Sequence, residues 1–484
     1  MSQRKKMNRL LLIFLSLLLA SCTTHKKVEP VAGDFCLEFG TDGKVKIVQF
    51  TDTHIRWDDR EAYVQSKGLQ ESILDTEKPD LVIFTGDVVT DIMAGEAWED
   101  FLKPCDERRI PFVVVFGNHD KEQTMSVSEL AEAVMAHPMC LNTCTDGELE
   151  DLAVEVKSCK GDAVAAVLYC FDSGDYSQSP DARQGYGWMR WDQIEWYRSL
   201  STAHTIANDG VPIPSYAFFH IPLPEYKEAF DGGCEVAGTR GEDECAGTVN
   251  SGIFASFLDC GDVHATFAGH DHSNDYVAVK DGIALCYGRY SGGNTSYHDL
   301  PSGARVIELT EGDYGLRTWV REPESEPTDE FVLSTDVDYA MRRSSTAEAR
   351  EHGLCCIEHK GSFGSPDEVL NGDIGDTVKL SIPYMPRVRE AGPHGCVIEG
   401  KIYVPESGVW LLHATAYLHG TLSIDDWTVS GRKRFQGGVN LEKGFHDIRI
   451  VFTGDPVSER LRLQWRKITD PRYKDIPADN MYIR

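Results

Sequence analysis

Five short polar clusters, each placed directly after an apolar run, most constrain how this chain can fold. They are TDTH after VKIVQF, TGD after LVIF, GNHD after PFVVVF, His220 after YAFF, and GHDH after ATFA. Near-continuous apolar runs of this length are typical of strands buried on both faces of an α/β sheet. Because loops at the carboxyl ends of parallel strands converge on one crevice, we expect the five clusters to meet in space.

The segments between these runs have helical spacing, so strands and helices alternate from residue 44 to about residue 320. The pattern predicts strands at 45–50, 81–84, 112–116, 163–171, 216–219 and 265–268. It predicts helices at 60–76, 96–102, 128–135, 191–203 and 253–258. Two later runs, 283–287 and 305–309, are expected to be antiparallel strands. This alternation favours an α/β domain with covered sheets.

The pattern changes beyond residue 320. The stretch REPESEPTDE is rich in Pro and Glu and lacks apolar anchors, so residues 321–350 are predicted to be a linker. From 351 to 484, apolar and polar residues alternate between short turns, which predicts a separate antiparallel β-sandwich domain. We expect Trp410, Trp427 and Trp465 to belong to its core.

Residues 1–22 are typical of an export signal. Basic residues precede the run LLLIFLSLLLA, which is too short for a comfortable membrane span. The run ends in LASC, which resembles the lipobox of bacterial lipoproteins and predicts lipidation of Cys22; a plain signal peptide with a chance cysteine is the alternative. Residues 23–43 are then a tether. The mature protein is expected to be an exported bacterial lipoprotein, anchored at the periplasmic or extracellular face of a membrane.

The charge of the chain limits its partners. The net charge is −29, whereas a nucleic-acid-binding face needs clustered Lys and Arg, so no nucleic-acid polymer is expected as a partner. In so acidic a protein, an anionic substrate depends on a local positive centre such as a metal ion.

The polar clusters consist of residue types that bind transition metals. Imidazole and carboxylate ligands suit Zn, Fe and Mn, and an aspartate can bridge two ions through its two oxygens. Each cluster alone is weak, because D-x-H triplets occur by chance and a single strand-end histidine is often structural. All five together favour a pair of metal sites with these candidate ligands: Asp52, His54, Asp87, Asn118, His220, His270 and His272.

Together, D-x-H, GD, GNHD, the strand-end H and GH-x-H resemble the motifs of the calcineurin-like metallophosphoesterase superfamily. The phrases IVQFTDTH, LVIFTGDVV and FFHIPLPEY are similar to its purple-acid-phosphatase-like branch. The resemblance covers residues 44–320 and implies a two-sheet αββα sandwich with two divalent or trivalent metal ions at one edge, drawn from Fe, Zn, Mn and Mg. It implies that phosphate esters are hydrolysed by a hydroxide held at the dinuclear centre.

The resemblance also implies a role for each residue. The first metal would be held by Asp52, His54 and His272, the second by Asn118, His220 and His270, and Asp87 would bridge them. His119 would contact the phosphate and protonate the leaving oxygen, as a general acid does. Asp120 would support the local geometry, and Asp271 is excluded from the ligands.

One position departs from the family. Purple acid phosphatases carry a tyrosine ligand three residues after the GD aspartate, and its bond to ferric iron gives them their colour. This chain has Thr90 at that position. The resemblance therefore implies a colourless enzyme, with iron still allowed as a metal.

The C-terminal domain resembles the carbohydrate-binding β-sandwich of the protective-antigen type, through GKIYVPESGVWLLHATA and LSIDDWTV. This implies a glycan partner, with Asp425 and Asp426 at a hairpin tip, although Asp is also a common turn former. Three functions stay open. The first is a phosphoesterase that favours phosphomonoesters, the second is a phosphodiesterase or nucleotide hydrolase, and the third is a surface glycan-binding lipoprotein with an inactive phosphoesterase-like domain.

Overall fold

The structure is a computed structural model. It describes residues 35–90, 93–177, 185–208, 210–232, 236–293, 300–333, 337–345, 351–380, 394–454, 462–467 and 472–483. The described residues begin at residue 35, so the predicted signal peptide and Cys22 lie outside them. Among the residues that are described, no helix combines the length and the apolar character needed to cross a membrane.

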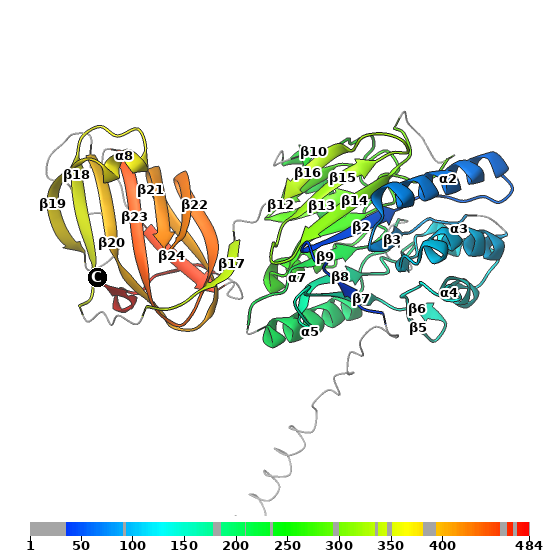
Figure 1. The fold of residues 1–484 in the computed structure, drawn as a ribbon, viewed down its shortest axis with the longest axis horizontal. Coiled ribbons are helices and arrows are strands. Elements are labelled where there is room, and N and C mark those ends of the chain that lie inside the picture. Colours follow the sequence, from blue (N-terminus) through cyan, green and yellow to red (C-terminus); the bar gives the residue numbers. More distant parts are fainter. Residues whose placement is uncertain are drawn as a thin grey trace, which may run out of the picture. The chain divides into compact units, whose positions relative to one another are not determined.

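A six-stranded sheet contains three of the predicted strands side by side in parallel (Figure 1). Its order is β16-β15-β14-β2-β3-β4. The strands are β2 (Lys44–Phe50), β3 (Leu81–Thr85), β4 (Phe112–Val115), β14 (Ala304–Thr310), β15 (Leu316–Arg321) and β16 (Thr328–Leu333). As predicted, β14 is antiparallel to its neighbours, since it pairs with both β2 and β15 in that sense.

An eight-stranded sheet has the order β1-β7-β8-β9-β11-β13-β12-β10. Its strands are β1 (Leu37–Glu38), β7 (Leu152–Lys157), β8 (Val164–Cys170), β9 (Ser215–Phe218), β10 (Val236–Ala237), β11 (Val263–Ala268), β12 (Val277–Lys280) and β13 (Ile283–Tyr287). The antiparallel prediction for 283–287 is only half right. Strand β13 is antiparallel to β12 but parallel to β11, because it is the next strand of the parallel set after β11.

Helices cover the outer face of each sheet. In one core, α2 (Arg60–Glu77), α3 (Ala94–Arg108) and α4 (Val127–Met135) pack with the six-stranded sheet. In the other, α5 (Trp191–Ala207), α6 (Glu225–Asp231) and α7 (Ile253–Cys260) pack with the eight-stranded sheet. Hydrogen bonds join the two sheets, among them one from Tyr216 Oη to the carbonyl of Gly315. The fold is therefore the α/β sandwich of two sheets and two helical layers that the sequence predicted.

Helix α3 is longer than the sequence indicated. The predicted helix ended at residue 102, whereas α3 continues through Pro104 to Arg108. Its apolar face also continues, because Phe101, Leu102 and Cys105 are all buried in the same core. Tertiary packing thus carries the helix past a residue that disfavours helix interiors.

The stretch predicted as a linker begins with regular structure. Strand β15 runs to Arg321, and β16 then pairs with it in the antiparallel sense. Phe331 and Leu333 of β16 are buried, while Val332 between them is 56% exposed. The linker prediction was therefore wrong for 328–333, because two apolar residues at period two anchor a short edge strand. It was also wrong for 337–342, which form a strand that pairs with Trp427–Leu441 of the C-terminal sheet.

The C-terminal region consists almost entirely of strands in one ten-stranded arrangement, and all its pairings are antiparallel except that between β17 and β22. The elements are β17 (Val337–Arg342), β18 (Leu354–Lys360), α8 (Pro366–Leu370), β19 (Asp373–Leu380), β20 (His394–Val404), β21 (Gly408–Ile424), β22 (Trp427–Leu441), β23 (Gly444–Gly454), β24 (Arg462–Lys467), β25 (Lys474–Asp475) and β26 (Met481–Tyr482). The separate antiparallel domain is as predicted. Trp410, Trp427 and Trp465 belong to its core, which confirms that expectation.

Candidate metal centre

The five polar clusters meet at the carboxyl ends of parallel strands from both sheets. The loops after β2, β3 and β4 come from the six-stranded sheet, and those after β9 and β11 from the eight-stranded sheet. Two groups of candidate ligand atoms result, each with all its atoms within 4.8 Å of one another. The groups are Asp52, His54 and His272, and Asp87, His220 and His270.

Four of these residues have a backbone conformation that non-glycine residues rarely adopt. The φ angles of Asp52, His54, Asp87 and His270 are 51°, 47°, 51° and 78°. Such left-handed conformations cost on the order of 1–3 kcal/mol each and persist where the surrounding structure imposes them. Here the hydrogen bonds from Asp52 N to the carbonyl of Gly86 and from His54 N to that of Asp87 hold the loops together.

In the first group, Asp52 lies between two imidazoles. Its Oδ1 is 3.5 Å from His272 Nε2 and 4.0 Å from His54 Nε2. In the second group, His220 Nε2 lies 3.2 Å from Asp87 Oδ2 and 3.2 Å from His270 Nδ1. In each group, the candidate ligand atoms of different residues therefore face a common point.

Asn118 faces the second group. Its Oδ1 lies 3.2 Å from His220 Nε2, and its Nδ2 donates a hydrogen bond of 3.3 Å to Tyr176 Oη. The amide oxygen is thereby turned toward the group, as a neutral oxygen ligand requires.

Asp87 joins the two groups. Its Oδ2 lies 3.2 Å from His220 Nε2 and 3.6 Å from His54 Nε2, so one carboxylate oxygen contacts a member of each group. Both Asp87 Oδ2 and His54 Nε2 are buried, and neither makes a hydrogen bond to any residue that the structure describes. Buried donors of this kind are left without hydrogen bonds when their partner is a metal ion, and imidazole with carboxylate suits Zn, Fe and Mn. The residues present therefore fit two metal ions.

The electrostatics of the site support ligand chemistry. Burial lowers the pKa of His54 to about 4 and that of His270 to about 3, so both imidazoles are neutral at pH 7, the form that binds metals. Burial alone would also lower the pKa of His220, but the adjacent Asp87 carboxylate raises it to about 10. A metal ion that binds His220 Nε2 would therefore displace a proton, because only the neutral imidazole is a ligand.

Asp120 organises the loops beneath these ligands. Its carboxylate is fully buried and accepts hydrogen bonds from the backbone N–H groups of Asp87, Val88, Val89 and Gly117, at 2.8–3.0 Å. Burial and the nearby charge of Asp87 raise the pKa of Asp120 to about 7, although the four donors favour its ionised form. The supporting role expected for this residue matches its contacts.

His119 lies at the open side of the site, in the short 3-10 helix η1 (His119–Lys121). Its ring centroid is 5.4 Å from that of His54, and its side chain is 39% exposed. The backbone N–H of His119 donates to Asp87 Oδ1 at 2.8 Å, which fixes this residue relative to the candidate bridging ligand.

Three residues near the site were not singled out individually from the sequence. Glu122 accepts hydrogen bonds from His119 Nδ1 and from Tyr176 Oη, and the ring of Tyr186 lies edge-on to His270 with 4.2 Å between centroids. No spacing pattern relates Glu122 to Tyr176, because they are 54 residues apart and meet only in the fold.

Two polar residues close to the motifs have other partners. Asp271 accepts hydrogen bonds from Tyr287 Oη and the backbone of Cys245, consistent with its exclusion from the ligands. Arg289 is buried and paired with Asp275 and Glu322. Its guanidinium group therefore forms ion pairs inside the protein.

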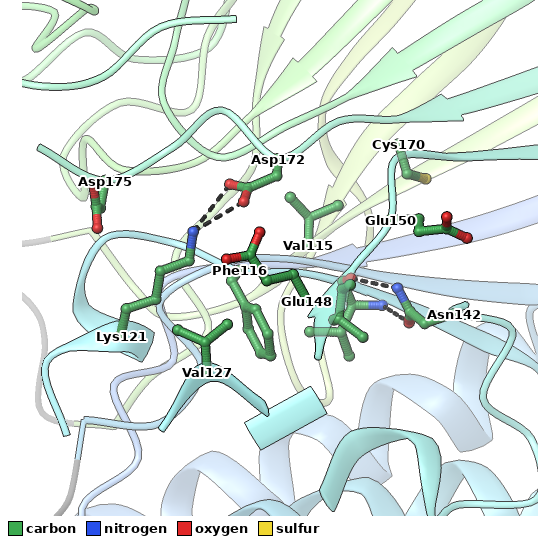
Figure 2. Close-up of a pocket in the computed structure, with 12 residues that line it drawn as sticks. Val115, Phe116, Lys121, Val127, Asn142, Glu148, Glu150, Cys170, Asp172 and Asp175 are labelled. Atoms are coloured by element: carbon green, nitrogen blue, oxygen red, sulfur yellow. Dashed lines mark hydrogen bonds and ion pairs between the residues drawn. The ribbon is translucent and has the colours of Figure 1, made fainter. Parts of the chain in front are cut away.

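A cavity of about 170 Å³ lies next to η1 but apart from the metal centre. Figure 2 shows Lys121 crossing it to reach Asp172, with Val115, Phe116 and Cys170 on its walls. None of the candidate metal ligands lines this cavity. We therefore place the chemistry at the shallower strand-end site.

The fold and the two joined ligand groups together define a metallophosphoesterase with a candidate dinuclear site. The family model described as calcineurin-like phosphoesterase matches residues 45–274, and the chain belongs to this family.

Relatives carry differing names. The chain is 29% identical to Arabidopsis thaliana "Probable inactive purple acid phosphatase 29", over 64% of this chain and 90% of that protein. It is 30% identical to "Probable inactive purple acid phosphatase 28" of the same plant, over 58% of this chain and 79% of that protein. It is also 30% identical to "Phosphatase DCR2" of Saccharomyces cerevisiae, over 58% of this chain and 54% of that protein.

Proposed function

We propose that this protein is an active metal-dependent phosphoesterase that prefers phosphomonoesters. The observation that carries the proposal is the pair of ligand groups that share Asp87, with His119 beside them on the exposed side. Separate structural histidines would have no reason to gather their ring nitrogens around two points.

The metal ligands are Asp52, His54 and His272 for one ion, Asn118, His220 and His270 for the other, and Asp87 for both. Two bound cations would supply positive charge for the phosphate and lower the pKa of a water molecule that attacks phosphorus. The protein holds the carboxylates and imidazoles in place before binding, through the strained loops and the Asp120 hydrogen bonds.

His119 is the residue that acts on the departing oxygen. Its exposed imidazole lies beside His54, where a substrate that reaches the ligand groups must pass. Proton donation to the leaving oxygen contributes about 10²–10⁴-fold in enzymes that use it.

The preference for monoesters rests on charge. The site holds two carboxylates, Asp52 and Asp87, so the positive charge for a substrate would come from the metal ions. A dianionic monoester gains more from two cations than a singly charged diester does. The test is a panel of aryl and alkyl mono- and diesters with the metal-reconstituted protein; higher kcat/KM on the diesters would instead establish the phosphodiesterase alternative.

The names of the two plant relatives favour a second candidate, a binding protein whose phosphoesterase-like domain is inactive. Against this candidate, every predicted ligand is present and placed within the two groups or beside them. Metal analysis of the purified chain separates the two readings. Close to two transition-metal ions per chain supports the enzyme, and none supports the binder.

A further inference from the structure

Glu122 accepts two hydrogen bonds that converge from different elements. His119 Nδ1 lies 2.6 Å from Glu122 Oε2, and Tyr176 Oη lies 2.7 Å from Glu122 Oε1. His119 is in η1, whereas Tyr176 follows β8 in the eight-stranded sheet. The carboxylate thus connects the exposed imidazole of the site to the opposite sheet.

A second contact ties the same two segments together. Lys121, next to Glu122 in the chain, forms an ion pair with Asp172, with Nζ 2.9 Å from Oδ2 (Figure 2). Asp172 precedes Tyr176 by four residues. The neighbouring residues Lys121 and Glu122 therefore both bind the loop that follows β8. Burial works against the charge of Lys121, but Asp172 outweighs it and raises the pKa of the ammonium group. These two contacts therefore fix the turn that carries His119 to the loop after β8.

We propose that Glu122 is the positioning residue of His119. Both carboxylate oxygens are occupied, one by the imidazole Nδ1–H and one by the Tyr176 hydroxyl, so the ring has a single orientation. The imidazolium gives its Nε2 proton to the departing oxygen, and the neutral ring that remains keeps its other proton on Nδ1, toward Glu122. This inference rests on the proposed function, in which His119 donates a proton to that oxygen.

The role of Glu122 differs from that of a residue which only stabilises the turn. Proton donation matters most when the departing oxygen is strongly basic, as in an alkyl phosphate, and little when it is weakly basic, as in p-nitrophenyl phosphate. A misoriented His119 therefore slows the alkyl ester selectively, whereas general loosening of the site slows both esters equally.

The experiment compares Glu122→Ala and Glu122→Gln with wild type in the full, metal-reconstituted chain. For Glu122→Ala we expect kcat on an alkyl phosphate to fall about 10- to 100-fold, as when a residue that orients a histidine is removed. On p-nitrophenyl phosphate we expect a change of less than about threefold, with unchanged metal content. Glu122→Gln keeps one acceptor for two donors, so its kcat on the alkyl phosphate should lie between those of wild type and Glu122→Ala.

Two further variants complete the series. Tyr176→Phe removes one donor to Glu122 and also the acceptor of Asn118 Nδ2, so its metal content is measured beside its rates. At equal metal content it should show the same dependence on the leaving group with a smaller amplitude. Glu132→Gln makes the same chemical change on the exposed surface of α4 and should behave as wild type on both esters. Equal losses on the two esters for Glu122→Ala, or no loss on either, would overturn the proposal.

A readout that needs no turnover keeps this inference separate from the proposed function. An imidazole N–H bound to a carboxylate gives a downfield proton signal, and His137 and His446 should each add one. We expect one signal to vanish in both His119→Ala and Glu122→Ala and to survive in Glu132→Gln. Were wild type inactive on every ester, the proposed function would fail while this signal still decided the contact; if no signal is lost in Glu122→Ala, the positioning role is refuted.

Discussion

At the residue scale, the site is built from side chains whose backbones are strained. Asp52, His54, Asp87 and His270 all have positive φ, and each follows a buried strand. A strand that ends in such a conformation turns its next side chain sharply across the sheet edge. The strain is offset by hydrogen bonds and, in the proposed enzyme, by the metal ions that the side chains bind.

His119→Ala should lower kcat on an alkyl phosphate by about 10²–10⁴-fold, the contribution typical of general acid catalysis, and should change kcat on p-nitrophenyl phosphate far less. Metal content should stay at the wild-type value, because the side chain belongs to neither ligand group. Steady-state kinetics and metal analysis on the same sample provide the check. Unchanged kcat on the alkyl phosphate would show that His119 takes no part in the mechanism.

Asp120→Ala leaves four backbone N–H groups of the ligand loops without their acceptor. We expect the free energy of unfolding to fall by about 2–4 kcal/mol, since buried donors without partners are costly. Affinity for metal should fall as well, because these loops carry Asp87. Denaturant titration and metal binding measure the two effects, and Asp162→Asn, at a fully exposed carboxylate, is the control; equal stability of the two variants would contradict the role.

Thr90 predicts the absence of colour. The purple of the related phosphatases comes from a tyrosine–iron bond at the corresponding position, and a threonine hydroxyl gives no such charge-transfer band. The protein loaded with iron should show no visible absorption of that kind. A tyrosinate–iron band in the iron-loaded sample would show that another tyrosine, such as Tyr176 or Tyr186, reaches a metal.

At the scale of elements, the parallel strands were the most predictable part of the fold. Strands β2, β3, β4, β9 and β11 lie within two residues of their predicted bounds, because strands buried on both faces are near-continuous apolar runs. The edge strand β16 was missed, because only Phe331 and Leu333 mark it within a Pro- and Glu-rich stretch. The C-terminal end of α3 was missed for a related reason, since packing there outweighs the local effect of Pro104.

Leu333→Ala tests whether the end of the predicted linker is a packed strand. Leu333 is 4% exposed, so its truncation should lower the free energy of unfolding by about 2–3 kcal/mol. Val332→Ala, at the neighbouring residue that is 56% exposed, should change it by less than about 0.5 kcal/mol. Thermal or denaturant melts compare the pair, and equal effects would mean that the segment is unpacked.

At the scale of the whole molecule, the chain has a metallophosphoesterase-family domain and a C-terminal region of strands. The C-terminal domain has its own core of buried tryptophans and apolar strands. At the tip between β21 and β22, Asp425 accepts hydrogen bonds from His446 and from the backbone of Asp447. These contacts give Asp425 a structural role in the hairpin, and glycan binding by this domain stays a prediction.

A substitution at Cys22 tests the predicted lipidation. In a bacterial host, Cys22→Ser should move the full chain from the membrane fraction to the soluble periplasmic or secreted fraction, since the acyl chains attach at this sulfur. Cys36→Ser changes an exposed cysteine outside the predicted signal and should leave the protein in the membrane fraction. Fractionation with mass determination follows wild type and both variants. A soluble wild-type protein without the added mass of acyl chains would favour the plain signal peptide.

The sequence by itself determined which residues stand at the strand ends and that their types suit two metal ions. These features are local, because the apolar runs and the residues that directly follow them are read along the chain. Only the tertiary structure decided that Asp87 contacts both ligand groups, that Glu122 joins His119 to Tyr176, and that β16 is packed. The physical reason is that such contacts join residues far apart in the chain, and their distances depend on how two sheets pack rather than on any local pattern.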